Sequence, residues 1–62
     1  MQTYIKTTDS TQYAAVRASR TQLLRVYPTA QIVPSTVRLR DMARIGAIPT
    51  YEILSDGRLA RL

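Results

Sequence analysis

Hydrophobic and polar positions near the N-terminus predict a β-strand followed by an α-helix. Residues 3–8 are rich in Thr, Tyr and Ile, a composition typical of a β-strand. The next two residues, Asp9 and Ser10, are of the kind that caps the N-terminus of a helix. Apolar side chains then recur with helical spacing, which predicts one amphipathic helix over residues 11–27. Pro28 ends this helix, because a residue that precedes proline avoids the helical region.

The C-terminal residues 51–62 predict a β-hairpin. Two short segments rich in apolar side chains flank the sequence Ser55-Asp56-Gly57. Asp-Gly is a strong hairpin signal, because glycine adopts the left-handed conformation that tight turns require.

The middle of the chain allows two interpretations. In the first, residues 31–41 form a strand with alternating apolar and basic side chains, and Pro34 lies at a sheet edge. In the second, Ser35 caps a helix over residues 36–45 that ends at Gly46. We favour the strand, since Val and Thr are β-branched, but both interpretations stay open.

Together these segments predict a single α+β domain over residues 1–62. One amphipathic helix packs on a small, mainly antiparallel sheet, in the order β-α-β-β-β. The alternative fold is a winged helix-turn-helix. The side chains expected in the core are Ile5, Tyr13, Val16, Leu23, Leu24, Tyr27, Val33, Val37, Leu39 and Ile53.

The charge distribution favours an anionic partner. The net charge is +5, and between Asp9 and Asp41 the chain carries arginines but no acidic residue. Such a basic field suits nucleic acid or an acidic face of a protein complex. The candidate binding residues are Arg17, Arg20, Arg25, Arg38, Arg40, Arg58 and Arg61. Tyr4 or Tyr51 is a candidate for stacking on a base beside one of them, whereas Tyr13 and Tyr27 are expected in the core.

Missing residue types argue against several kinds of protein. The chain has no Cys and no His, so we expect no disulfide, metal, cofactor or catalytic triad, no enzyme and no small-molecule substrate. It has no apolar stretch long enough for a signal peptide or a membrane span, which leads us to expect a cytoplasmic protein without a membrane partner. A chain this short buries little surface, which favours a homodimer or docking onto a larger assembly.

Part of the sequence from residue 34 onward resembles winged helix-turn-helix regulators of the MerR and excisionase type. The similar pieces are Pro34-Ser35-Thr36-Val37-Arg38, then Gly46-Ala47-Ile48-Pro49, then the Asp56-Gly57 hairpin. The resemblance implies that Thr36, Arg38 and Arg40 read DNA and that Arg58 and Arg61 on the wing contact phosphate. The interval between Val37 and Gly46 is longer than in that family, and the two prolines at positions 28 and 34 leave no room for its preceding helix.

The predicted size and element order also resemble very small phage-encoded proteins, including some anti-CRISPR proteins. That resemblance implies a non-enzymatic protein that blocks a host complex, and it carries no residue-level motif. Two functions are therefore expected. The first is a nucleic-acid-binding accessory or regulator of a phage or other mobile element, and the alternative is an interaction protein that inhibits a host protein complex.

Overall fold

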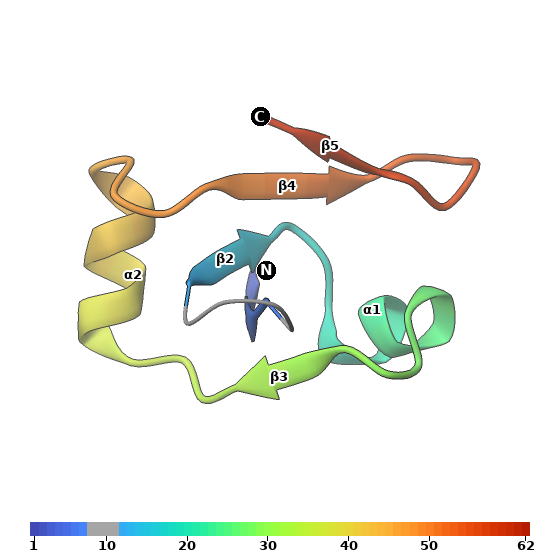
Figure 1. Ribbon diagram of the computed structural model, residues 1–62, viewed down its shortest axis with the longest axis horizontal. Coiled ribbons are helices and arrows are strands. Elements are labelled where there is room, and N and C mark those ends of the chain that lie inside the picture. The colour runs from blue at the N-terminus through green and yellow to red at the C-terminus, as the bar shows by residue number, and fades with distance from the viewer. Residues whose placement is uncertain (8–11) are drawn as a thin grey trace.

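The computed structural model describes residues 1–7 and 12–62, which form one five-stranded sheet and two helices (Figure 1). The α+β class is therefore confirmed. In chain order the elements are β1 (Thr3–Lys6), β2 (Tyr13–Val16), α1 (Arg20–Val26), β3 (Gln31–Val33), α2 (Val37–Arg44), β4 (Thr50–Ile53) and β5 (Leu59–Arg61). Compared with the expected order, the structure adds a second strand before α1 and a second helix after β3.

The sheet has the strand order β3-β1-β2-β4-β5 and is mainly antiparallel, as expected. Strand β1 pairs antiparallel with β2 and β3, and β4 pairs antiparallel with β5. The exception is the parallel pair of β2 and β4, in which Val16 lies beside Tyr51. Parallel neighbours need a long crossover connection, and here α1, β3 and α2 provide it.

The two helices cover opposite faces of the sheet. Leu23 of α1 packs with Val16 and Ala18 and with partly buried side chains such as Ile5 and Ile53. Leu39 of α2 packs on the other face, against Tyr4 and Ala15. Neighbouring strand residues point to opposite faces, so the pair Ala15 and Val16 contributes to both clusters. Figure 1 shows α1 and α2 at opposite ends of the molecule.

The prediction of one helix over residues 11–27 is wrong in its first half. Residues 13–16 form β2, and α1 begins only at Arg20, where the Ser19 hydroxyl accepts the Gln22 N–H at 3.1 Å. Ala15 and Val16 are completely buried, because β2 lies between two strands and between two packed faces. The predicted end of the helix is confirmed, since α1 stops at Val26. The capping role expected for Asp9 and Ser10 lies outside the described residues.

The preference for a strand over residues 31–41 is wrong beyond β3. Pro34 follows β3 directly, and α2 then begins after Thr36, whose hydroxyl accepts the Leu39 N–H at 3.1 Å. Thr36, rather than Ser35, is therefore the cap. The helix ends before Gly46, which has a φ of +80° and takes the left-handed conformation common at helix ends. The alternative interpretation of this segment matches the structure closely.

The C-terminal hairpin is confirmed. Strands β4 and β5 are joined by a turn in which Gly57 has a φ of +89°. The Asp56 carboxylate accepts the Arg58 N–H at 3.1 Å, which closes the turn.

The core prediction is partly confirmed. Val16, Leu23 and Leu39 are buried, whereas Val37 is 65% exposed because it lies on the outer side of α2. The other expected core residues are half-buried: Ile5, Tyr13, Leu24, Tyr27, Val33 and Ile53. The buried apolar residues that the sequence prediction missed are Tyr4, Ala14, Ala15, Ala18 and Ile48.

Candidate functional site

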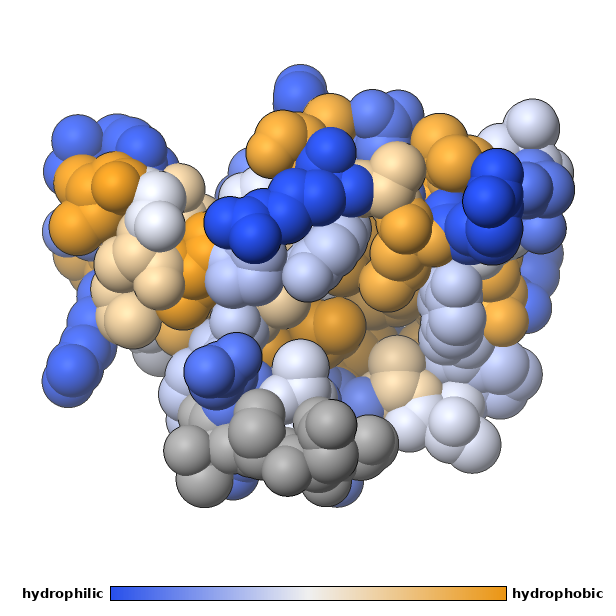
Figure 2. All heavy atoms as spheres, turned by 45° about the horizontal axis from the view of Figure 1, so that its top comes forward, coloured by the Kyte–Doolittle hydropathy of each residue, from blue (hydrophilic) through white to orange (hydrophobic). Residues whose placement is uncertain are grey.

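The outer side of α2 forms a basic surface with apolar ends. Residues three and four apart share one side of a helix, and at that spacing α2 and its cap present Val37, Arg40, Asp41, Arg44 and Ile45, all exposed. Val37 and Ile45 are 65% and 68% exposed, which is unusual for large aliphatic side chains. Figure 2 shows apolar surface beside hydrophilic side chains at the α2 end of the molecule.

Two of the three α2 arginines have partners within the protein, but both contacts are weak. Arg44 Nη2 lies 3.5 Å from Asp41 Oδ1, and both side chains are largely exposed. Arg40 Nη1 lies 3.4 Å from the Ser35 hydroxyl. Exposed contacts of this length contribute little free energy and are easily exchanged. Both guanidinium groups can therefore turn to an external anion at little cost.

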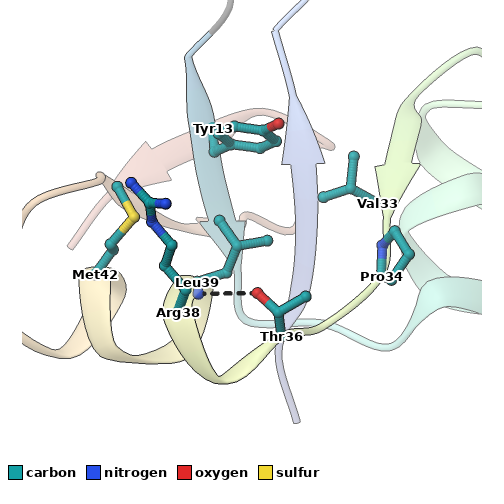
Figure 3. A pocket seen from close by; sticks show the side chains of 7 residues that line it. All are labelled: Tyr13, Val33, Pro34, Thr36, Arg38, Leu39 and Met42. Carbon is teal, nitrogen blue, oxygen red and sulfur yellow. Dashed lines mark hydrogen bonds between the residues drawn. The ribbon is translucent and has the colours of Figure 1, made fainter.

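A groove of about 480 Å³ lies between α2 and the sheet (Figure 3). The sheet contributes Tyr13 and Val33, and α2 contributes Arg38, Leu39 and Met42. The connection between β3 and α2 closes the groove with Pro34 and Thr36. The lining is mostly apolar, and within residues 1–7 and 12–62 Arg38 is the one charged side chain that contributes to it.

The Tyr13 hydroxyl differs from those of Tyr4 and Tyr27, and the Arg38 guanidinium differs from those of Arg40 and Arg44 on the same helix. The Tyr4 hydroxyl donates to Gln2 at 3.1 Å, and the Tyr27 hydroxyl donates to the Gly57 carbonyl oxygen at 2.6 Å. Within residues 1–7 and 12–62, neither the Tyr13 hydroxyl nor the Arg38 guanidinium has a hydrogen-bond or ion-pair partner. Both lie beside the groove with their polar groups accessible.

The other predicted arginines do not join this surface. Arg20 and Arg25 belong to α1, on the opposite face of the sheet. Arg17, expected on the same helix, instead follows β2, where its backbone N–H donates to Tyr51. Its side chain lines a separate hollow with Glu52.

The two hairpin arginines are also separate from α2. Arg58 Nε lies 2.7 Å from the Asp56 carboxylate at the turn, so this cation is already paired. Arg61 lies on β5 opposite Tyr51. The seven predicted binding residues therefore do not form one patch, and only Arg38 and Arg40 lie at the candidate site.

The sequence prediction did not include Tyr13 or Met42 among the site residues, and it named Arg44 only in an alternative binding surface with Glu52, Arg58 and Arg61. It assigned Tyr13 to the core and named Tyr4 and Tyr51 as stacking candidates, but Tyr4 is 3% exposed. Tyr13 is half-buried: it packs against the core cluster on the α2 face of the sheet and also lines the groove. The helical interpretation of residues 36–45 would have predicted Arg44 as a site residue, because Arg44 lies four positions after Arg40 and therefore on the same side of the helix.

The described part of the chain contains neither a candidate metal site nor a candidate membrane-spanning helix. Residues 1–7 and 12–62 contain no cluster of three or more His, Cys, Asp or Glu side chains that could hold a metal ion. In the same residues no helix is long and apolar enough to cross a membrane.

No protein family, curated protein or solved structure matches this chain. The winged helix-turn-helix resemblance agrees with the structure in one part, since α2 is followed by Gly46 and the hairpin of β4 and β5. In a helix-turn-helix, however, a short turn joins two consecutive helices. Here β3 separates α1 from α2, and the two helices pack on opposite faces. The candidate site is therefore argued from its own geometry.

Proposed function

We propose that this protein is a small, non-enzymatic nucleic-acid-binding accessory or regulator, of the kind that phages and other mobile elements encode. The observation that carries the proposal is the basic surface of α2, where three arginines accompany one aspartate in eight residues. Arg38 has no partner among the described residues, and the contacts of Arg40 and Arg44 are weak and exposed. This surface supports phosphate binding without any rearrangement of the fold.

Phosphate binding by such a surface has a measurable signature. Each arginine that neutralises a phosphate releases counterions, so affinity falls as the salt concentration rises. Fluorescence anisotropy with labelled DNA at several salt concentrations measures this slope. The double variant Arg40→Gln/Arg44→Gln is expected to weaken binding and to lower the log–log salt slope by roughly two units, one for each contact.

The matched control is Arg20→Gln/Arg25→Gln, which removes the same charge from exposed positions on α1. This variant is expected to bind within about twofold of the parent, because long-range effects of exposed charges are screened by salt. Equal losses in both double variants would show that net charge alone drives binding, and the α2 surface would then have no special role.

Val37 and Ile45 favour a second candidate function. These two exposed aliphatic residues stand at the two ends of the basic side of α2, and exposed apolar positions beside charge are typical of protein interfaces. The alternative is therefore an interaction protein that docks α2 on an acidic face of a host protein complex. Val37→Ser/Ile45→Ser would weaken such docking, whereas DNA binding through phosphate would be retained.

Three further expectations belong to the same proposal. Because the proposed role is non-enzymatic, we expect no cofactor and no small-molecule substrate. With a nucleic-acid or protein partner of this kind, the protein is expected to act in the cytoplasm. Its small core favours a homodimer. Co-purification from a host lysate, with and without nuclease, separates the two partner classes, because only a protein partner persists after nuclease treatment.

A further inference from the structure

The groove beside α2 combines an aromatic ring, an apolar wall and a cation that has no partner among the described residues. Figure 3 shows the Arg38 side chain extending from α2 with its guanidinium next to Met42 in this view, and the Tyr13 ring farther along on β2. Val33, Pro34, Leu39 and Met42 supply the apolar part of the lining, and among the described residues no carboxylate lines the groove. A ligand that matches this lining is flat and largely apolar, with a negative charge beside it.

We propose that this groove takes one unpaired base of a single-stranded nucleic acid, stacked on the Tyr13 ring, with the adjoining phosphate at the Arg38 guanidinium. The inference rests on the proposed function and names single strands as the partner. Aromatic rings stack on any base, and basic side chains follow the backbone in proteins that bind single strands. The groove of about 480 Å³ falls in the size range of pockets that hold small planar ligands.

Two accessible polar groups without partners among the described residues support this occupant. Thr36 also lines the groove, but its hydroxyl is already used as the cap of α2. Tyr13 and Arg38 have no such partner among the described residues, so their polar groups are available to a base edge and a phosphate. Met42 is flexible and polarizable, which suits a wall that must accept bases of different size.

The arginines of α2 extend the proposed site along the bound nucleic-acid strand. Arg38 borders the groove, whereas Arg40 and Arg44 lie on the outer side of the same helix. Eight residues of helix span about 12 Å, which is the length of three to four phosphates of a duplex strand at about 3.4 Å rise and of fewer in an extended single strand. One base in the groove and one or two further phosphates on α2 therefore fit one short segment.

Duplex DNA cannot use the groove in the same way. The faces of a paired base are covered by its stacked neighbours, and a base must leave the helix before it can enter a pocket. Duplex binding would therefore involve the phosphate contacts alone. The inference predicts that single strands bind more tightly than duplexes of the same length.

The test is fluorescence anisotropy with three labelled probes: an oligothymidylate, an abasic oligonucleotide with the same number of phosphates, and a duplex of equal length. Stacking of one base corresponds to about 5- to 150-fold in affinity, so oligothymidylate is expected to bind more tightly than the abasic probe by a factor in this range. Tyr13→Leu is expected to abolish the difference, whereas Tyr13→Phe, which keeps the ring, is expected to retain it. Arg38→Gln is expected to weaken binding to both probes.

A second variant with a fluorescence readout tests the inference even if Tyr13→Leu fails to fold. The chain contains no tryptophan, so Tyr13→Trp places a single indole in the groove. Oligothymidylate is expected to quench its fluorescence, and the abasic probe is expected to leave it unchanged.

The outcomes separate the two proposals. Equal affinity for oligothymidylate and the abasic probe, with the loss in Arg40→Gln/Arg44→Gln preserved, would overturn the groove inference and leave the proposed function standing. Absence of binding to all three probes would overturn both. Quenching of Tyr13→Trp by a polyglutamate peptide, but not by oligothymidylate, would assign the groove to a protein partner and would also overturn the inference.

Discussion

The Tyr27 hydroxyl donates a 2.6 Å hydrogen bond to the Gly57 carbonyl oxygen, 30 residues away in the chain. This bond joins the C-terminal end of α1 to the turn between β4 and β5. Gly57 also lies close to α1, because a Cβ at this position would be 3.5 Å from a Val26 methyl group. The hairpin is therefore held to the helix by its turn as well as to the sheet by β4.

Tyr27→Phe tests this connection. The variant keeps the ring in the core and removes the hydroxyl, so the free energy of unfolding is expected to fall by about 1 kcal/mol. In a domain of this size such a change lowers Tm by roughly 4–8 °C. Thermal unfolding followed by circular dichroism measures the shift. Tyr51→Phe is the matched control, because the Tyr51 hydroxyl has no partner among the described residues; an equal shift in both variants would contradict the assignment.

Thr3→Val tests a buried hydrogen bond at the start of β1. The Thr3 hydroxyl donates to the Ala18 carbonyl oxygen at 2.7 Å, and Thr3 is buried. Valine has nearly the same shape but leaves that carbonyl oxygen without this donor, which is expected to cost about 1–3 kcal/mol. Chemical denaturation gives the value. Thr3→Ser keeps the donor and is expected to retain more stability than Thr3→Val; the reverse order would rule out this role for the bond.

Thr36→Ala tests the start of α2. Loss of the capping hydroxyl is expected to destabilise the protein by about 0.5–2 kcal/mol. Ser35→Ala is the control, since the Ser35 hydroxyl makes only an exposed 3.4 Å contact with Arg40, and its effect is expected to stay within about 0.5 kcal/mol. A larger loss in Ser35→Ala would place the cap at Ser35, as the helical interpretation of the sequence had it. Backbone chemical shifts of residues 37–44 provide a second check on this helix.

The proposed homodimer makes a separate prediction. Strands β3 and β5 form the two edges of the sheet, and each is three residues long. An edge strand offers unpaired backbone groups to a second copy, so light scattering is expected to give twice the chain mass at micromolar concentrations. A monomer mass throughout that range, together with a cooperative unfolding transition at high temperature, would count against association.

The sequence could predict the elements whose signals are local. Asp56-Gly57 marked the hairpin, and Pro28 marked the end of the first helix, because each acts through its own backbone conformation. Strand β2 could not be predicted in this way. Ala14, Ala15 and Val16 are all buried, and a strand covered on both faces shows no alternation of apolar and polar side chains. The short apolar run of β2 was therefore assigned to the predicted helix over residues 11–27.

The candidate site was harder to predict than the fold. The choice between strand and helix at residues 36–45 depended on the β-branched Val37, but Val37 lies exposed in the first turn of α2, where its preference for a strand has little effect. The groove also forms only where α2 packs beside β2, and no local sequence pattern predicts that packing. Tyr13 and Arg38 are distant in sequence and line the same groove only because α2 packs on the sheet.

The parallel pairing of β2 and β4 has a consequence for how the protein folds. The hairpin of β4 and β5 is local and forms quickly, whereas joining β4 to β2 closes a loop that contains α1, β3 and α2. Contacts so far apart in sequence form slowly. During synthesis, β2 therefore keeps one unpaired edge until β4 has left the ribosome. The most deeply buried strand of the native protein is thus among the last to gain its full set of partners, and until then its unpaired edge is open to wrong pairing.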